Sequence, residues 1–293
     1  MCRSKKPRNS KGFVMSWLDR YNKNKRKLLD ANLYDSIQEH DACGVGFIAS
    51  IDGKPNRRVV TSGIEALKAV WHRGAIDADG KTGDGAGIHI EIPKAFFEEE
   101  IKKTGHEMMQ GDLGMGMIFL PRNDYSALEK CRTIVESELI DHGYFIYGWR
   151  QVPVDTSVIG KKANLTRPEI EQVMFVNNKE RTENEDLDKE LFLIRRRIEK
   201  RILKIQISEF YICSLSFKSV IYKGLFLAEE LEVFYPDLQD KNFISSFAIF
   251  HQRYSTNTFP SWALAQPFRA LAHNGEINTI SGNSNWMRSH ENR

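Results

Sequence analysis

From residue 43 onward, apolar positions recur with the two periods of secondary structure, about 3.6 residues for a helix and two for a strand. The clearest helix is predicted over residues 186–205, where leucine and isoleucine return at helical spacing. Shorter helices are predicted over 95–103 and 126–140. The opposite face of the 186–205 helix is predicted to be solvated, and it carries Arg195, Arg196, Lys200 and Arg201.

The region after residue 51 predicts a turn and then a further helix. DGKPN at 52–56 is a turn sequence. Ser62 is placed to cap a helix that Gly74 closes, because the apolar residues between them share one face. That helix would end with the cations His72 and Arg73, which favourably meet the helix dipole.

Apolar runs and alternating patterns predict at least eight strands. CGVGFIASI, residues 43–51, is interpreted as a buried strand that begins at its cysteine. The other predicted strands lie within residues 88–93, 113–121, 144–154, 171–177, 209–216, 219–227 and 243–255. Strands outnumber helices and several follow one another directly, as in hairpins. This order favours an α+β fold with antiparallel sheets over a parallel doubly wound fold.

Charge separates a leader from the main body. The chain of 293 residues has a net charge of +3, and residues 1–42 hold ten Lys and Arg against five Asp and Glu. The remainder is therefore slightly acidic, which argues against a nucleic-acid-binding body. The leader is predicted to be a solvated basic tail, with a transit peptide as the weaker alternative, and Met1 and Met15 are both candidate starts. No run of 18 apolar residues is present, so no membrane span is predicted.

The four cysteines, Cys2, Cys43, Cys131 and Cys213, show no paired spacing. This usage indicates a reducing compartment and gives no support for a disulfide framework or a metal site. Cys131 lies on the apolar face of a predicted helix and Cys213 within an apolar strand, so both are interpreted as core. Residue type alone favours the same interpretation for Cys43, because free cysteine is among the most buried residues.

Three segments contain polar residues that core packing does not explain. They are CGVGF at 43–47, HRGAIDADGKTGDGAG at 72–87, and HQRYSTNTFPSWALAQPFRALAHNGEINTISGN at 251–283. The glycines of the second match no phosphate-binding pattern and favour a tight loop. Asn274-Gly275 in the third is typical of a hairpin turn, which the sequence alone favours, and it is also a workable pair of oxyanion donors.

These segments, together with GWRQVP at 148–153 and RRRIEKR at 195–201, resemble the class II glutamine amidotransferase domain of the glutamate synthase large chain. The resemblance runs from about residue 33 to the end. It implies an α+β fold of the N-terminal nucleophile hydrolase type, a four-layer αββα sandwich. It also implies two parts, a leader of residues 1–42 removed on maturation and an amidotransferase domain of residues 43–293.

The resemblance assigns roles to six residues. Cys43 corresponds to the nucleophile, exposed as a new N-terminus, and Arg73 matches a family arginine close to it. Arg253 matches the residue that pairs with the α-carboxylate of glutamine, and Thr256 lies in the same substrate loop. Asn274 and Gly275 match the oxyanion hole. The family aspartate that binds the α-amino group lies beyond Arg293, so the chain is expected to be an N-terminal portion.

The implied reaction is hydrolysis of L-glutamine to glutamate and ammonia in the cytoplasm, with the ammonia destined for 2-oxoglutarate in the full enzyme. No metal or cofactor is expected in this chain, since FMN and the iron–sulfur cluster belong to the absent synthase domain. The expected partners are the rest of glutamate synthase and its small subunit, with no nucleic acid or membrane. Two alternatives stay open: the glutaminase domain of another class II amidotransferase, and an inactive fragment or binding module that retains the fold.

Overall fold

The computed structural model divides the chain into two units, residues 1–43 and residues 44–293. It describes residues 23, 25–27 and 29–30 of the first unit, all of which are helical. In the second unit it describes residues 44–178, 187–253, 259–270 and 280–291. Everything below concerns the second unit.

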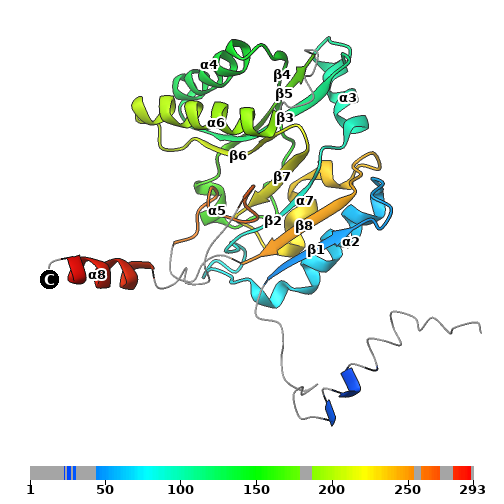
Figure 1. Ribbon diagram of the computed structural model, residues 1–293, viewed down its shortest axis with the longest axis vertical. Helices are drawn as coiled ribbons and strands as arrows, with labels where there is room; N and C mark the ends of the chain where they lie inside the picture. Colours follow the sequence, from blue (N-terminus) through cyan, green and yellow to red (C-terminus); the bar gives the residue numbers. More distant parts are fainter. Residues whose placement is uncertain are drawn as a thin grey trace, which may run out of the picture. The chain divides into compact units, whose positions relative to one another are not determined.

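The first sheet contains four antiparallel strands in the order β1-β8-β2-β7 (Figure 1). These are β1 (Val45–Ala49), β8 (Phe247–Gln252), β2 (Ala86–Glu91) and β7 (Ser219–Gly224). β8 joins strands from opposite ends of the unit, because it pairs with β1 on one side and with β2 on the other. The order therefore places the last predicted strand in the centre of the sheet.

The second sheet is also antiparallel and has the order β4-β5-β3-β6. Its strands are β4 (Phe145–Gln151), β5 (Glu169–Asn177), β3 (Asp112–Leu120) and β6 (Tyr211–Ser216). β6 and β7 follow one another with only Phe217 and Lys218 between them, so a tight connection links the edges of the two sheets.

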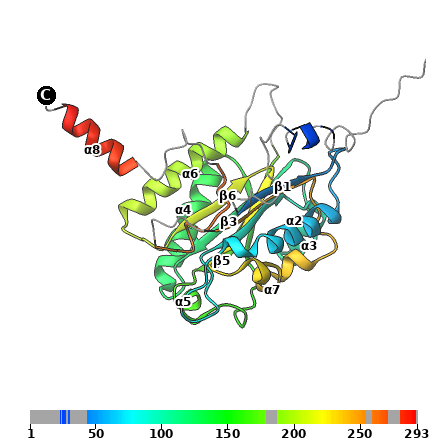
Figure 2. The same cartoon turned by 90° about the horizontal axis from the view of Figure 1, so that it is seen from below.

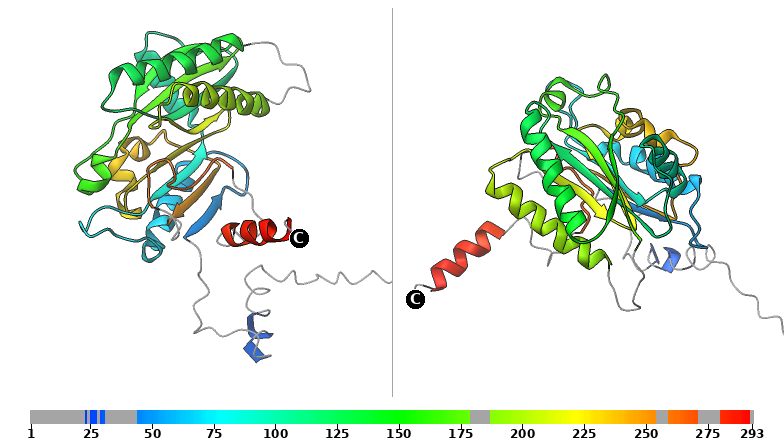
Figure 3. Two further views of the ribbon diagram at one scale, coloured as in Figure 1. Left: turned by 90° about the vertical axis from the view of Figure 1, so that its left-hand side faces the viewer. Right: turned by 90° about the horizontal axis from the view of Figure 1, so that it is seen from above.

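Two long helices cover one face of the second sheet, α4 (Tyr125–Asp141) and α6 (Leu187–Lys204), and they pack against each other (Figures 1 and 3). Alternation along β3 explains the two faces. Ile118 and Leu120 point toward these helices, whereas Met117 and Phe119 belong to a second, larger core. Side chains two apart on a strand share a face, so each strand contributes to both cores.

The larger core is shared by both sheets and by the remaining helices. α2 (Arg57–Ala69) packs on β8 and β1, and α3 (Lys94–Lys103) contacts β4 (Figure 2). Aromatic rings from α3 and from the segment around α7 (Leu231–Phe234) meet here in edge-to-face pairs, for example Phe96 with Phe243. The short helices are α5 (Lys161–Leu165), η1 (Trp71–Arg73), η2 (Ala228–Glu230) and η3 (Pro236–Gln239), and α8 (Ile280–Glu291) is the last described element.

Two sequence-based boundaries are wrong. The helix predicted to begin after Ser62 begins at Arg57, because the Asn56 side chain accepts a hydrogen bond from the Val59 N–H at 3.1 Å and caps it. The Arg57 guanidinium also donates to the Leu238 carbonyl at 2.6 Å, which ties the first turn to the core. The helix ends at Ala69 rather than at Gly74, and residues 71–73 form the separate turn η1.

Two burial predictions are also wrong. β1 was expected to be a buried strand, but it lies at the edge of its sheet and leaves Val45 and Phe47 exposed by 50% and 65%. Arg195 was expected on a solvated face, but it is buried and donates to Glu199 at 2.6 Å. The predicted α+β class with antiparallel sheets is confirmed.

Candidate active site

Strand pairing brings the three unusual segments together at one end of the first sheet (Figure 1). β8 runs antiparallel to both neighbours, so its last residues lie beside the first residues of β1 and β2. The Gln252 N–H donates to the Gly44 carbonyl at 2.6 Å, and the Arg253 N–H donates to the Gly85 carbonyl at 3.2 Å. The segments beginning at 43 and 251 and the end of the 72–87 segment therefore meet.

Arg73 lies next to the residue that follows the predicted nucleophile. It stands in η1, directly after α2, and it is half-buried. A Cβ built on Gly44 would lie 3.2 Å from the Arg73 Cβ. The structure thus places the predicted site residue Arg73 beside Gly44, which follows Cys43 in the sequence.

Arg253 lies at the same end of the sheet, directly after β8. Its φ of 150° is a conformation that side-chain-bearing residues rarely adopt. Strained backbone of this kind costs of order 1–3 kcal/mol and concentrates at functional sites. The adjoining Gly85 carbonyl holds the Arg253 N–H, so the strained residue is fixed between β8 and the start of β2.

Four of the six predicted site residues lie outside the described residues. They are Cys43, Thr256, Asn274 and Gly275. The two that are described lie at the same end of the sheet: Arg73 is beside Gly44, and Arg253 directly follows Gln252.

Close backbone approach explains two glycines of the predicted motifs. A Cβ on Gly44 would stand 1.8 Å from the Gln252 carbonyl oxygen. A Cβ on Gly74 would stand 2.0 Å from the Gln252 side-chain nitrogen. The first contact is with backbone, so only glycine fits after Cys43; the second is with the end of a side chain, so a larger residue after Arg73 would displace the Gln252 amide.

Gln252 is the residue that sequence reasoning missed. Gln252 is fully buried, with its backbone against Gly44 and its side chain against Gly74. Among the described residues neither its amide oxygen nor its amide nitrogen has a hydrogen-bond partner, and the same holds for Nδ1 of His251. Buried polar groups without partners are uncommon in folded proteins. The signal available in the sequence was a glutamine at the inward position of an alternating strand.

Burial also sets the charge state of His251 at this end of the sheet. The His251 ring is largely removed from water, and this lowers its pKa to about 4. At neutral pH the ring is therefore uncharged, and Arg73 and Arg253 supply the cationic character of this end of the sheet.

The described cysteines do not resemble nucleophiles. Cys131 lies on the buried face of α4 and Cys213 within β6, both buried as predicted. Burial raises the pKa of the Cys131 thiol to about 11 and that of the Cys213 thiol to about 12. Because the thiolate is the reactive form, both sulfurs are inert at neutral pH.

The loop between η1 and β2 is held by its own polar residues. Asp79 accepts hydrogen bonds from the Lys81 and Thr82 N–H groups at 3.0 and 2.7 Å, and from the Thr82 hydroxyl at 2.6 Å. These bonds, the Thr82 hydroxyl first, hold the pKa of Asp79 far below its usual range. The DADGKTGDG sequence therefore folds as a tight loop, as predicted, and its carboxylates serve that loop.

Residues 259–270 precede the predicted oxyanion residues and are anchored to the body at three points. The Trp262 indole N–H donates to the Ala163 carbonyl at 3.0 Å. The Lys223 Nζ donates to the Ala263 carbonyl at 2.7 Å, and an Arg269 Nη donates to the Ile212 carbonyl at 2.6 Å. Lys223 is buried beneath the rings of Tyr211 and Phe268, and burial lowers its pKa to about 8.

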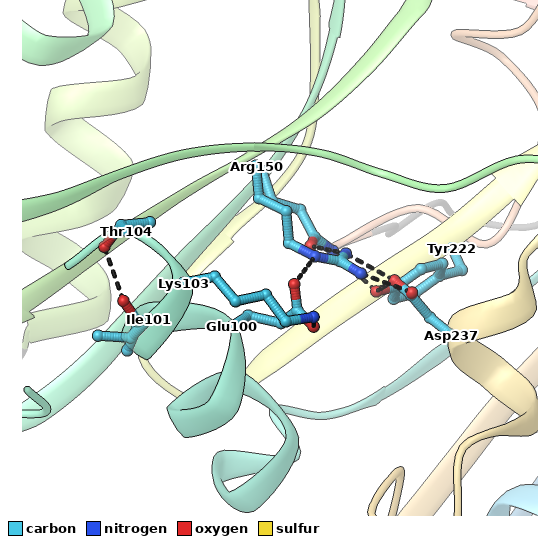
Figure 4. A network of polar contacts seen from close by, with 8 residues as sticks. Glu100, Ile101, Lys103, Thr104, Arg150, Tyr222 and Asp237 are labelled. Atoms are coloured by element: carbon cyan, nitrogen blue, oxygen red, sulfur yellow. Dashed lines mark hydrogen bonds and ion pairs between the residues drawn. The ribbon is translucent and has the colours of Figure 1, made fainter. Parts of the chain in front are cut away.

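The GWRQVP motif has a different role, because Arg150 is the centre of a buried network (Figure 4). Its guanidinium donates to both Asp237 carboxylate oxygens at 2.7 Å, to Glu100 at 2.7 Å and to Gln172 at 2.9 Å. Tyr222 donates to Asp237 and accepts from Gln172. Burial opposes the charge on Arg150, but the hydrogen bonds that it donates to Asp237 and Glu100 keep its pKa above the usual value. This motif joins the two sheets.

Within the described residues, no group of three histidine, cysteine, aspartate or glutamate side chains could hold a metal ion. In the same part of the chain, no helix combines the length and apolar character that crossing a bilayer requires.

The family model for class-II glutamine amidotransferases matches residues 43–293, and the chain therefore belongs to that family. The predicted fold class and enzyme class are confirmed by this match. The matched region begins at Cys43.

Similar proteins identify the branch of the family. The chain is 62% identical over 270 residues to the glutamate synthase [NADPH] large chain of Azospirillum brasilense, covering 92% of this chain and 18% of that protein. It is 44% identical over 262 residues to the chloroplastic ferredoxin-dependent glutamate synthase of Spinacia oleracea, covering 89% and 16%. The ferredoxin-dependent glutamate synthase of Pyropia yezoensis is 45% identical over 265 residues, covering 89% and 17%. The predicted resemblance to glutamate synthase is confirmed, and the chain spans less than a fifth of the length of these relatives.

Proposed function

We propose that residues 43–293 form the glutaminase part of a glutamate synthase, in which Cys43 hydrolyses L-glutamine to glutamate and ammonia. The observation that carries the proposal is the meeting of Gly44, Arg73 and Arg253 at one end of the first sheet. Two arginines and the residue after the candidate nucleophile come there from three distant segments.

The proposed nucleophile requires cleavage between Ala42 and Cys43. A free thiol is only a small fraction thiolate at neutral pH. An N-terminal cysteine carries its own α-amine, with a pKa of about 7.7–8, which can accept the thiol proton. While residue 42 is attached, the same nitrogen is an amide and cannot act as a base.

The reaction proceeds through a thioester. The Cys43 sulfur attacks the δ-carboxamide carbon of glutamine, and the negative charge moves to the carboxamide oxygen. Asn274 and Gly275 would donate hydrogen bonds to that oxygen, and one such donor is worth about 3–4 kcal/mol in comparable sites. The C–N bond breaks as the protonated α-amine gives its proton to the leaving ammonia. Water then attacks the thioester, releasing glutamate and restoring the thiol.

Substrate recognition would fall to the arginines. The planar Arg253 guanidinium suits the two oxygens of the glutamine α-carboxylate, with Thr256 in the same loop. Arg73, whose Cβ lies beside Gly44, would be the second substrate-binding arginine. In a whole glutamate synthase the ammonia would pass to 2-oxoglutarate, in the cytoplasm, with the small subunit as the expected partner.

Two measurements test the proposal. N-terminal sequencing and intact mass of the purified chain should show a mature start at Cys43; an active protein with its leader intact contradicts this. Cys43→Ala should reduce glutamine hydrolysis to background, whereas Cys131→Ala should retain it, because the Cys131 thiol is buried with a raised pKa. Equal losses in two folded variants would show that Cys43 is not the nucleophile.

A further inference from the structure

Two arginines lie side by side in a part of the unit that the proposed function does not use. Arg122 stands between β3 and α4, and Arg167 stands between α5 and β5. Both donate to the same side-chain oxygen of Asn164, at 3.4 and 3.3 Å. Their other contacts are to the carbonyls of Leu165 and Pro168, each at 3.4 Å. All three acceptor atoms are neutral, and all four distances are at the long end of the hydrogen-bond range.

Three other arginines of this unit are paired with carboxylates, whereas half-buried Arg57 donates to the carbonyls of Leu238 and Phe243. Arg132 meets Glu171 at 2.5 Å, Arg150 meets Asp237 at 2.7 Å, and Arg195 meets Glu199 at 2.6 Å. Among the described residues, neither Arg122 nor Arg167 has a carboxylate within ion-pair distance. Since arginine stays charged in proteins, two cations here share one neutral amide.

The two guanidinium groups line a cavity of about 380 Å³. Its walls combine the rings of Phe119, Tyr211 and Trp262 with the hydroxyls of Thr166, Ser208 and Ser261. One carboxylate residue, Glu209, also lines the cavity. A concave, mostly apolar space with a few converging polar groups is the usual form of a small-molecule site.

Electrostatics indicates the sign of the ligand. Burial lowers the pKa of Arg167, and the neighbouring charge of Arg122 lowers it further, while Glu169 opposes the shift. Glu169 itself accepts a hydrogen bond from Gln151 at 2.6 Å. An anion between the two guanidinium groups would relieve their repulsion and would accept short, charge-assisted hydrogen bonds from them.

We propose that this cavity binds a small organic anion, with a carboxylate or phosphate group between Arg122 and Arg167 and an apolar part against Tyr211 and Trp262. Bidentate guanidinium contacts suit both oxyanions. Trp262 belongs to the anchored segment 259–270, so the ligand would contact that segment directly. The inference does not depend on the glutaminase proposal, because no candidate site residue lines the cavity.

Calorimetric titration of the full chain tests the proposal. Inorganic phosphate, benzoate and phenyl phosphate are titrated separately at constant ionic strength. Phenyl phosphate should bind more tightly than phosphate because it fills the apolar wall, and comparison with benzoate distinguishes a phosphate site from a carboxylate site. Absence of saturable binding of all three probes up to about 50 mM, a concentration at which even weak fragment-like sites are occupied, would overturn the proposal.

Variants locate the binding. Arg122→Gln together with Arg167→Gln should weaken phenyl phosphate binding by about tenfold or more. The matched control, Arg196→Gln with Lys200→Gln, removes the same charge from the exposed face of α6 and should change binding by less than about twofold. Equal weakening in both double variants would reduce the effect to overall charge and sink the proposal.

Thermal unfolding shows whether each variant is folded. The ligand should raise the melting temperature of the parent chain but not that of the Arg122, Arg167 double variant. If that variant does not fold, Arg122→Lys keeps the charge but loses the planar fork, and it should still weaken phenyl phosphate binding by several-fold. Unchanged binding in a folded Arg122→Lys protein counts against the site.

Discussion

Two buried polar regions of the same unit differ in how completely their hydrogen bonds are satisfied. Around Arg150, the guanidinium donates to three side chains, and Tyr222 and Gln172 complete the network. At the end of β8, the Gln252 amide and Nδ1 of His251 have no partner among the described residues, and Arg253 has strained backbone.

The difference separates two uses of polar residues. A saturated network of short bonds stabilises one arrangement of the two sheets and leaves nothing to offer a ligand. Unsatisfied buried atoms beside strained backbone stabilise nothing by themselves and are typical of functional sites. GWRQVP and HQRYS are equally part of the family resemblance, but only the second has the physical character of a site.

Removing the centre of the network should give the largest effect. Arg150→Met leaves Asp237 and Glu100 as buried carboxylates without their cation. We expect a loss of about 3–5 kcal/mol in the free energy of unfolding, since breaking a buried ion pair strands the other charge. Urea unfolding measures it. A loss below about 1 kcal/mol would mean that the network is not structural, and the contrast with the β8 end would fail.

Gln252 should respond in the opposite way. Gln252→Leu removes an amide that has no partner among the described residues, so the free energy of unfolding should fall by less than about 1 kcal/mol. Glutamine hydrolysis should fall by about tenfold or more, because the side chain packs on Gly74, the residue after Arg73, and the Gln252 backbone pairs with Gly44. Steady-state kinetics beside urea unfolding reports both. A stable variant with full activity would remove Gln252 from the site.

Lys223 predicts a pH dependence of stability. Its pKa is about 8 in the folded chain and 10.5 in the unfolded chain, so above pH 8 the unfolded state binds more protons. The free energy of unfolding should therefore rise by about 1 kcal/mol between pH 8 and 9 from this group, and the rise should be absent in Lys223→Met. Comparing the two chains in a Cys213→Ala background cancels the opposing titration of the buried Cys131 thiol and removes that of the Cys213 thiol, whose pKa the charge of Lys223 lowers. Identical slopes would show that Lys223 is not desolvated.

The smallest effect is expected at the surface. Lys162 pairs with Asp77 at 2.7 Å, but both side chains are exposed. Lys162→Met should change the free energy of unfolding by no more than about 0.5 kcal/mol, as exposed pairs typically do. A larger loss in urea unfolding would indicate that the loop after η1 depends on this pair.

Much of the fold could be predicted because single elements carry strong local signals. α4 and α6 have long amphipathic repeats, and the alternation of β2 appears in the sequence. The start of α2 could not be predicted, because Asn56 competes with Ser62 and the contacts of Arg57 with distant carbonyls decide between them. The exposure of Phe47 depends on strand order, which no local pattern contains.

The candidate site was predicted by resemblance, and the structure adds only part of its geometry. Arg73 lies beside Gly44, and Arg253 lies directly after Gln252, whose N–H donates to the Gly44 carbonyl, but their roles remain predictions. Cys43, Thr256, Asn274 and Gly275 remain predictions, since they fall outside the described residues. Gln252 was missed because its significance comes from the absence of partners around it, and a sequence contains no information of that kind by itself.

The edge position of β1 has a mechanical consequence. Among the described strands, β1 has one neighbour, β8, and its other side carries backbone groups with no strand to pair with. The candidate nucleophile lies two residues before β1 begins. Among the described strands, β1 is therefore held in its sheet from one side. A second strand paired along that edge would restrict the motion of β1, and the backbone amides of Val45 and Phe47 would exchange hydrogen more slowly.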